Sequence, residues 1–519
     1  MITSLFCRKP LLGIFLVILS TGVALAQKKS DENSSGKADL YKSKKDAFEY
    51  LSDSLIIKKY GVISDAIWNY AELGMQEFKS SAILIKTLEE EGFNVEKGVA
   101  GMPTCFVASW GSRKPVIGIL GEFDALPGLS QKALCPEQSP LIDGAPGHGC
   151  GHNTMGTAGI AAAIAVKRSM QKNNLPGTIK FFGSPAEETI ISRPFMVRAG
   201  VFNDVDAVID NHSSSDFTTS YGVKGSAVMS VVFSFKGKTA HAASAPWDGR
   251  SALDGVELMN VAANYLREHL FYTYRLHYVI TEGGEAPNVV PDRASVWYYI
   301  RDTDGRIEET YKRVLDCARG AAISSGTTLD TVSFLTAIHQ RHLNKGMAET
   351  IERNIELVGM PEWTENEQSF AMALQKELGV KEIGYPSMIK PMGSPDLTSF
   401  GEGSSDVGEV TLIAPTATLN FPGKVPGAIG HHWSSVASFY GPAAWKGLNA
   451  GAKVMAATAL DLLTKPELLE EIKVEFKEYS KDHPYKSFLP EGANPPLDLN
   501  KKIMDKYRDT MMQLGANEK

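Results

Sequence analysis

The sequence has few cysteines and no excess of basic residues. Five cysteines among 519 residues are too few for a chain that folds on a disulfide framework. The chain has 53 Lys and Arg residues and 60 Asp and Glu residues. The net charge of −7, without a basic arm, argues against a general nucleic-acid-binding protein. No Gly-Xaa-Ser-Xaa-Gly motif is present, which disfavours a serine hydrolase.

Long hydrophobic runs are absent beyond the first 26 residues. Arg8 and Lys9 precede an apolar run over 11–26, which ends in a small-residue cleavage site before Gln27. This run is shorter than the ~20 residues that a membrane-spanning helix needs. We therefore expect residues 1–26 to be a cleaved signal peptide. The mature chain would be periplasmic or secreted and would keep no stable membrane span.

The cysteine spacing leaves the redox state of three thiols open. Cys7 would leave with the signal peptide, and Cys150 lies in a motif with the character of a metal site. Cys105, Cys135 and Cys317 could be free or bonded, and a Cys105–Cys135 bridge is one of the arrangements that the spacing allows.

The chain is longer than one core usually holds, and its content of 43% hydrophobic and 22% charged residues is typical of globular proteins. Helical periodicity over 47–95 precedes apolar, strand-like runs over 115–121, 178–182 and 207–209, with a helix of small residues over 154–170. Strands that alternate with helices predict a mostly parallel α/β sheet, whose ligands bind at the carboxyl ends of the strands.

The pattern changes after residue 221. Strand-like runs over 228–235, 275–281 and 295–301 alternate with helical segments over 251–269 and 307–323. This order suits a compact α+β unit inserted into the larger domain, because helical segments return after residue 350. We predict a catalytic domain in two parts around one insert, followed by a tail; the boundaries are 40–221, 222–340 for the insert, 341–475, and 476–519 for the tail.

Metal-ligand chemistry is concentrated in a few motifs. Cys150 and His152 lie two residues apart among three glycines, which let the backbone turn tightly, and a thiolate and a neutral imidazole are good ligands for zinc-like metals. Glu187, Glu188 and His212 each follow a strand-like run. A hydrolytic two-metal site needs such ligands, one bridging anion and a base. We predict two divalent ions, zinc or manganese, with Glu187 as general base; the predicted metal ligands are Cys150, His152, Glu188, His212 and His431.

These motifs resemble, as an ordered set, a family of dinuclear metallo-amidohydrolases that includes aminoacylases, indole-acetyl-amino-acid hydrolases and carboxypeptidase G. The likeness is greatest to the branch of the aminobenzoyl-glutamate hydrolase B subunit, and it covers nearly all of the mature chain. The stretches that carry the resemblance are Glu122–Pro127, Gly147–Asn153, Pro185–Glu188, Asn211–His212 and His431–Trp433.

The resemblance implies a role for each motif. It places Cys150 in the bridging position. The family's last ligand is a His two residues before a Trp, which selects His431, with His432 as the alternative. Glu122 and Asp124 are expected to orient histidine ligands without binding metal themselves.

The resemblance also implies that the insert is a dimerisation lid. Within Lys238–Ala243, His241 would reach the site of a partner subunit and stabilise the tetrahedral oxyanion. Asn288 and Arg301 match positions that hold the carbonyl or carboxylate of the substrate, and a guanidinium suits a carboxylate by bidentate pairing. For Arg301, a salt bridge at a strand end is the alternative.

The predicted fold is therefore an α/β, mostly parallel-sheet, metallopeptidase-like catalytic domain with an inserted α+β dimerisation (lid) domain. The predicted reaction is metal-dependent hydrolysis of the amide bond of a small N-acyl or N-aroyl amino acid, in a homodimer or together with a homologous second subunit. A dipeptidase or carboxypeptidase with the same site is one alternative, and a non-catalytic metal-binding or peptide-binding relative is another. Glu187 argues against the latter, because binding alone does not require a base.

Overall fold

The computed structural model describes residues 42–395 and 403–517. Within these residues the larger domain is built on a seven-stranded sheet of order β1-β2-β4-β3-β5-β13-β6. Its four central strands, β4, β3, β5 and β13, run parallel, and antiparallel strands flank them on both sides. The strands are β1 Asn94–Lys97, β2 Phe106–Gly111, β3 Val116–Gly121, β4 Thr178–Gly183, β5 Ala207–Ser214, β6 Thr218–Thr219 and β13 Thr416–Pro422.

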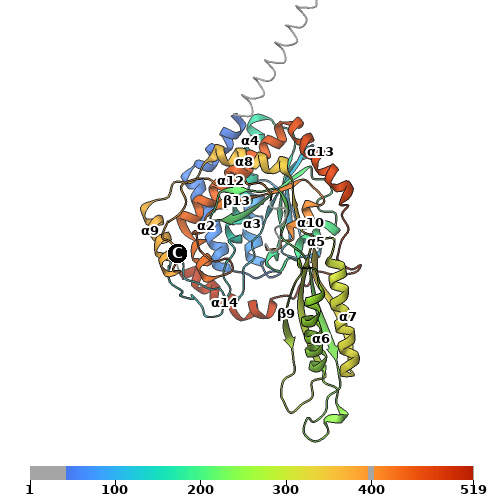
Figure 1. The fold of residues 1–519 in the computed structure, drawn as a ribbon. Coiled ribbons are helices and arrows are strands. Elements are labelled where there is room, and N and C mark those ends of the chain that lie inside the picture. Colours follow the sequence, from blue (N-terminus) through green and yellow to red (C-terminus); the bar gives the residue numbers. More distant parts are fainter. Residues whose placement is uncertain (1–41, 396–402, 518–519) are drawn as a thin grey trace, which may run out of the picture.

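Helices cover this sheet (Figure 1). The small residues of α4, His152–Asn173, let the helix pack closely onto the strands, and nearly all of its residues are buried. Gly156 in this helix allows the closest approach, because a Cβ there would lie 2.6 Å from the carbonyl oxygen of Glu122. The other helices of this domain are α2 Ser54–Tyr70, α3 Phe78–Glu90, α5 Ser192–Arg198, α8 Lys345–Val358, α9 Glu365–Glu377, α10 Val407–Thr411, α11 Trp433–Ser438, α12 Gly441–Thr464, α13 Pro466–Asp482 and α14 Lys501–Asn517.

The inserted unit is a second, antiparallel sheet of order β11-β8-β10-β9. Its alternating strand residues, such as those of β8 and β10, bury one face against helices α6 and α7. The unit projects from the larger domain in Figure 1. Its elements are β8 Ala227–Lys236, α6 Ala252–Leu266, β9 Arg275–Glu282, β10 Arg293–Asp302, α7 Ile307–Ser325 and β11 Thr328–Ile338. The predicted α/β fold with an inserted α+β domain is confirmed.

Two short strands join the units. β7, Gly222–Lys224, leads into the insert, β12, Arg341–Leu343, leads out of it, and the two pair antiparallel in a separate ribbon. The predicted boundaries at 221/222 and 340/341 divide this ribbon between two domains, although its strands form one unit. The boundary at 475 falls inside α13, because the amphipathic helix continues across it.

The predicted tail is helical at its end and packs on the larger domain. In α14, Met504 and Met511 are buried in a small cluster with Ala71 and Leu73. Arg508 of α14 also forms an ion pair with the buried Glu72. The polar composition of this segment therefore reflects an amphipathic helix with one buried stripe.

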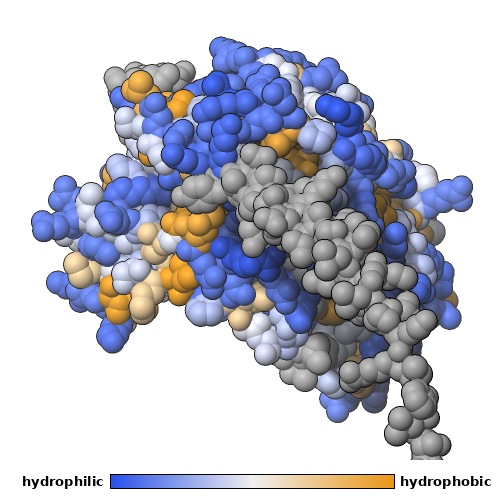
Figure 2. Space-filling view, turned by 90° about the horizontal axis from the view of Figure 1, so that it is seen from above, coloured by the Kyte–Doolittle hydropathy of each residue, from blue (hydrophilic) through white to orange (hydrophobic). Residues whose placement is uncertain are grey.

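The face in Figure 2 is mostly hydrophilic, with separate hydrophobic patches. None of the helices in the described parts of the chain is long and apolar enough to cross a membrane. The predicted signal peptide over 1–26 lies outside the described residues. Cys105, Cys135, Cys150 and Cys317 are all free, so the bridge that the sequence allowed between Cys105 and Cys135 does not form.

Candidate metal centre and active site

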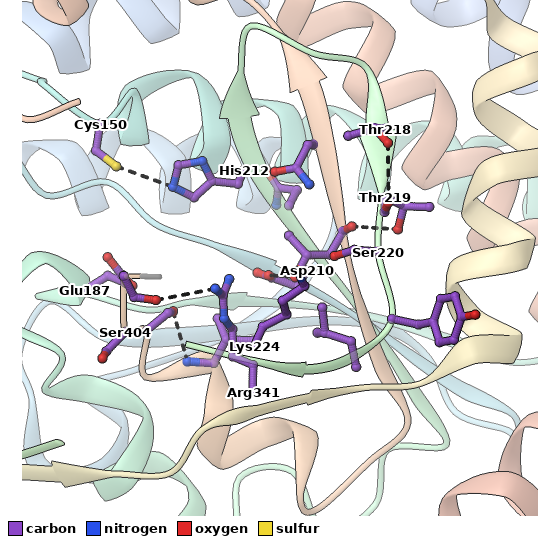
Figure 3. Close-up of a pocket in the computed structure, with 18 of the residues that line it drawn as sticks. Cys150, Glu187, Asp210, His212, Thr218, Thr219, Ser220, Lys224, Arg341 and Ser404 are labelled. Carbon is purple, nitrogen blue, oxygen red and sulfur yellow. Dashed lines mark hydrogen bonds between the residues drawn. The ribbon is translucent and has the colours of Figure 1, made fainter. Parts of the chain in front are cut away.

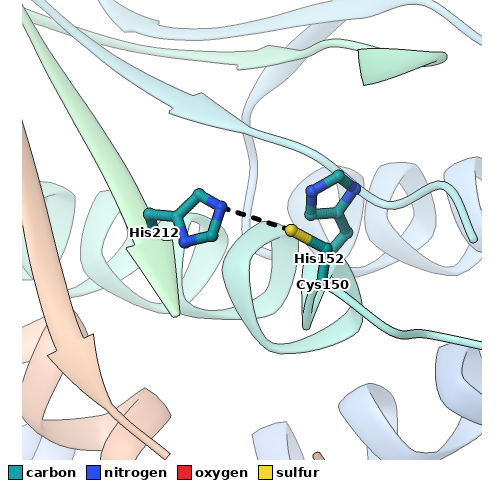
Figure 4. A group of neighbouring side chains, drawn as sticks. All are labelled: Cys150, His152 and His212. Atoms are coloured by element: carbon teal, nitrogen blue, oxygen red, sulfur yellow. Dashed lines mark hydrogen bonds between the residues drawn. The ribbon is translucent and has the colours of Figure 1, made fainter. Parts of the chain in front are cut away.

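Three predicted ligands meet at the carboxyl end of β5 and the start of α4. Gly151, with φ 87°, precedes α4 and turns the chain so that Cys150 and His152 face the same point. The Sγ of Cys150 lies 3.4 Å from Nε2 of His212, which β5 carries (Figure 4). Polar residues therefore gather where a parallel sheet leaves a crevice.

The donor atoms form two groups that share one thiol. Within each group the atoms lie no more than 4.8 Å apart. A thiolate common to two groups can bridge two metal ions, and nitrogen and sulfur donors of this kind suit zinc-like metals. The groups are Cys150 with His152 and His212, and Cys150 with Glu188 and His431; a third group, without the thiol, is Glu122 with His152 and Glu187.

Hydrogen bonds orient both histidines, His152 and His212, toward the cluster. Nδ1 of His152 donates to Oδ1 of Asp124 at 2.9 Å, and Nδ1 of His212 donates to the carbonyl of Ser213 at 2.8 Å. Each ring thus presents Nε2 to the cluster, as metal-binding histidines usually do. Nε2 of His152 and Oε1 of Glu188 are buried without a hydrogen-bond partner, as expected of atoms placed to bind a cation.

The pKa shifts of these side chains also indicate a site that would bind positive charge. Burial, and then the charge of Glu188, raises the pKa of the Cys150 thiol to about 12. Burial also raises the pKa of Glu188 to about 8. Burial and the charge of His152 lower the pKa of His212 to about 3, which keeps its ring neutral. A divalent ion can replace the protons that the thiol and the carboxyl hold, so these residues fit a metal site.

The loop that carries the two adjacent glutamates is strained and fixed, and both carboxylates lie near Nε2 of His152, Glu187 at 3.7 Å and Glu188 at 3.9 Å. Ala186 and Ile190 flank them at φ 55° and 54°. The N–H of Ala186 donates to the buried Glu77 at 2.7 Å, and the N–H of Glu188 donates to Oδ2 of Asp124 at 2.9 Å. Glu188 then reaches His431, whose Nε2 lies 3.3 Å away.

Glu187 and Glu188 both line the cavity, and Oε2 of Glu187 lies beside His152. Glu187 belongs to neither of the two groups that share Cys150, but to the third group with Glu122 and His152. The structure leaves its carboxylate exposed to the space in which a substrate and a water molecule would meet.

Glu122 differs from its predicted role. It was expected to orient a histidine by contacting the ring nitrogen that does not bind metal. Instead, its Oε2 lies 3.4 Å from Nε2 of His152, the nitrogen that faces the cavity. Its other oxygen pairs with Arg193 at 2.7 Å, and Arg193 also pairs with Asp406. Arg193, Asp406 and Glu77 were not predicted from the sequence, because buried polar residues of this kind stand in no local motif.

His431 and His432 have different surroundings. His431 belongs to a donor group. His432 is the N-cap of α11, and its Nδ1 lies 2.9 Å from the hydroxyl of Ser434. Of the two alternatives, the structure brings His431 to the cluster, although its side chain is exposed and that of His152 is buried.

A cavity of about 660 Å³ opens beside the cluster, and Figure 3 shows its residues. Arg301 lines this cavity, and its Nη1 donates to the hydroxyl of Ser404 at 2.6 Å. The cavity-lining residues of the described chain do not include His241 and Asn288. These two lie together in the insert, where His241 forms a bridge with Val289 and the N–H of Ala242 donates to the carbonyl of Asn288.

His241 and Asn288 lie at the end of the insert that is remote from the cavity. His241 follows the far end of β8, and Asn288 lies in the connection between β9 and β10. In Figure 1 these connections form the tip of the insert. Within one chain, the structure therefore separates these two predicted site residues from the cluster.

Several known proteins are similar to this chain. The sequence model of peptidase family M20/M25/M40 matches residues 118–485. The chain is 36% identical over 465 residues to the B subunit of p-aminobenzoyl-glutamate hydrolase from Escherichia coli, which covers 84% of this chain and 96% of the relative. It is 28% identical over 475 residues to Xaa-Arg dipeptidase of Mus musculus, which covers 87% of this chain and 96% of that relative.

A solved structure extends the likeness to the fold. A dinuclear metal-binding peptidase of the M20 family from Bacillus subtilis matches with a TM-score of 0.51 at 18% identity, over 79% of this chain and 99% of that one. The resemblance predicted from the motifs is thereby confirmed. Since the family's sequence model spans most of the chain and includes all the metal-ligand candidates, the protein belongs to peptidase family M20/M25/M40.

Proposed function

We propose that this protein hydrolyses the amide bond of a small N-acyl or N-aroyl amino acid, of the aminobenzoyl-glutamate kind, with two divalent metal ions. The observation that carries the proposal is the sharing of Cys150 by two donor groups directly beside Glu187. The names of the E. coli and mouse relatives, a hydrolase and a dipeptidase, support cleavage of an amide bond. The donor set of thiolate, imidazole and carboxylate favours zinc, and manganese is the alternative.

Each residue has a part in this reaction. Cys150, His152, Glu188, His212 and His431 would hold the two ions, which when bound polarise a carbonyl and lower the pKa of water. Glu187 takes a proton from the attacking water and passes it to the leaving amine, which requires a carboxylate that is near the ions but not bound by them.

Arg301 binds the carboxylate of the amino acid. Its guanidinium faces the same cavity, and Tyr299 packs against it with 5.3 Å between the guanidinium carbon and the ring centroid. A planar group held in this way can form two parallel hydrogen bonds to a carboxylate. Asn288, in the lid, would bind the carbonyl of the substrate.

The lid acts on the site of a partner subunit. Nδ1 of His241 accepts hydrogen bonds from the N–H groups of Ala243 and Ser244, at 3.2 and 3.3 Å. The neutral ring therefore carries its proton on Nε2, which makes that atom a donor for an oxyanion. Since His241 lies in the lid and away from its own chain's cavity, the complete site requires a dimer.

The partner is a second copy of this chain or a homologous subunit. Exposed apolar residues on α6 and the edge strand β9 support an interface there: Leu258, Val261, Tyr265, Val279 and Ile280. The name of the E. coli relative describes it as the B subunit of a hydrolase, which supports the alternative of two different subunits. Cleavage of residues 1–26 would place the assembly in the periplasm or outside the cell.

A hydrolysis screen of metal-reconstituted protein tests the proposal. We expect release of free amino acid from N-acetyl and N-aroyl amino acids, and loss of this activity with a chelator and in Glu187→Gln. Cleavage of unblocked dipeptides alone would favour the dipeptidase alternative. Tight substrate binding without turnover under any metal would favour a non-catalytic relative.

A further inference from the structure

Two cationic side chains face each other across the ribbon that joins the lid to the catalytic domain. Arg341 of β12 pairs directly with Lys224 of β7, and both line the cavity beside the metal cluster. Like charges directly opposite on paired strands repel one another. Figure 3 shows both residues beside the cavity, so an anionic group that enters it would be attracted by two positive charges.

The guanidinium of Arg341 finds few hydrogen-bond acceptors within the protein. Its Nη2 lies 3.5 Å from the carbonyl of Gly403, at the outer limit of a hydrogen bond, and its Nε is buried without a partner. Buried donors are usually paired, because an unpaired one loses its hydration without compensation. A ligand that enters the cavity can supply the missing acceptor.

The other face of the ribbon holds Arg341 in place. His342 points away from the cavity side, where its Nε2 lies 2.7 Å from Oδ2 of Asp304 and its ring contacts the hydroxyl of Tyr479. Gln340 exchanges hydrogen bonds with Asp304, and its side chain also donates to the carbonyl of Gly225. A fixed ribbon keeps the orientation of Arg341 before any ligand binds, which reduces the entropy lost on binding.

Three of the four carboxylates that line the same cavity have partners other than Arg341, although the charge of Arg341 is among those that oppose the rise that burial causes in the pKa of Asp210. Glu122 pairs with Arg193, Glu188 belongs to the metal cluster, and Asp210 accepts a hydrogen bond from Thr418 at 2.7 Å. Burial lowers the pKa of Arg301, whose Nη1 donates to the neutral hydroxyl of Ser404. The cavity thus holds two arginines, Arg301 and Arg341, that can each bind an anionic group.

We propose that Arg341, with Lys224 across the ribbon, forms a second anion subsite that binds the side-chain carboxylate of the substrate's amino acid. This inference rests on the proposed function, in which Arg301 binds the α-carboxylate. It restricts the substrate class to N-acyl derivatives of acidic amino acids. A cationic residue at the same position, as in the name of the mouse relative, would be repelled.

Paired substrates that differ in one charge test the subsite. We expect wild-type protein to hydrolyse N-acyl-L-glutamate with a kcat/KM about 10- to 100-fold higher than N-acyl-L-glutamine, the range typical of one charge-assisted contact. Arg341→Gln should abolish this preference through a higher KM for the glutamate compound, and Arg341→Lys should restore part of it. Lys345→Gln removes an exposed charge close to the ribbon but outside the cavity, and it should keep the wild-type preference.

Binding measurements keep the test independent of turnover. Calorimetry with metal-loaded protein should show tighter binding of N-acetyl-L-glutamate than of N-acetyl-L-glutamine, and no difference in Arg341→Gln. If no amide is hydrolysed but this difference is found, the subsite stands and the proposed reaction is wrong. Equal binding of both compounds to wild type, or an equal loss of both in Arg341→Gln, would overturn the subsite.

Discussion

Asp124 connects the two donor groups of the metal centre. One of its oxygens accepts the Nδ1–H of His152 at 2.9 Å, and the other accepts the backbone N–H of Glu188 at 2.9 Å. His152 belongs to one donor group and Glu188 to the other. A single buried carboxylate therefore orients one ligand in each of these two groups.

The first prediction concerns this carboxylate. Asp124→Ala should weaken metal binding about 10- to 100-fold, the usual effect of removing a group that orients metal ligands. Competition with a chromogenic chelator would measure the change. Asp505→Asn, which removes an exposed carboxylate on α14, is the matched control and should bind metal normally. Unchanged metal affinity in Asp124→Ala would show that backbone packing alone orients His152.

The second prediction separates Glu187 from Glu188. Glu187→Gln should keep the metal content and lose at least ~10²–10⁴-fold in kcat, because the proton transfer is lost. Glu188→Gln should instead lower the metal content, because a carboxylate ligand is replaced by a neutral amide. Elemental analysis beside initial rates separates the two effects. Metal loss in the Glu187 variant with full occupancy in the Glu188 variant would reverse the assignment.

Much of the catalytic domain could be predicted because its signals are local. Each buried strand of the parallel sheet reads as an apolar run, and polar residues stand at its carboxyl end, as Asp124 and His212 do. Parallel strands bring such ends together whatever their distance in the sequence. The candidate ligands could therefore be selected from sequence, and the structure places His152 and His431 in two groups that share Cys150.

The residues that were missed depend on contacts between distant segments. Arg193 is informative only because it meets Glu122 and Asp406 in the folded chain. Arg341 becomes a candidate ligand-binding residue only through its register with Lys224, since neither short strand has a recognisable pattern. The amphipathic stripe of α14 was overlooked because its composition is polar and its buried partners, such as Ala71 and Leu73, lie far away in the sequence.

The third prediction concerns pH. Burial raises the pKa of Asp65 from 3.8 to about 6, although the carboxylate accepts a hydrogen bond from the N–H of Gly441. Between these values the folded state holds a proton that the unfolded state has released. The free energy of unfolding should therefore fall as pH rises from 4 to 6. The loss amounts to roughly 2–3 kcal/mol.

The variant Asp65→Asn checks this effect, because its amide oxygen can keep the bond from Gly441 without titrating. Its free energy of unfolding, from urea denaturation of metal-free protein, should depend less on pH in this window and should exceed that of wild type near pH 7. Glu49→Gln, which removes an exposed carboxylate near the start of the described chain, serves as a control. The same pH dependence in wild type and Asp65→Asn would contradict the shift.

The fourth prediction concerns His241 and the dimer. If its Nε2–H stabilises charge that exists only in the transition state, His241→Ala should lower kcat strongly and change KM little. Metal content should stay the same, because the residue lies in the lid rather than in the cluster. A loss of metal would instead indicate that the variant disturbs the fold.

Mixing two inactive variants tests whether His241 acts on the partner's site. In a dimer of His241→Ala with Glu187→Gln, one site combines an intact Glu187 with an intact His241 from the other subunit, and the second site has neither. Random exchange of equal amounts should thus restore about a quarter of the wild-type activity, since half of the dimers are mixed and each has one complete site. Subunit exchange can be followed with differently tagged chains. If exchange is complete and the mixture remains as inactive as its parents, His241 acts within its own chain or only supports the structure of the lid.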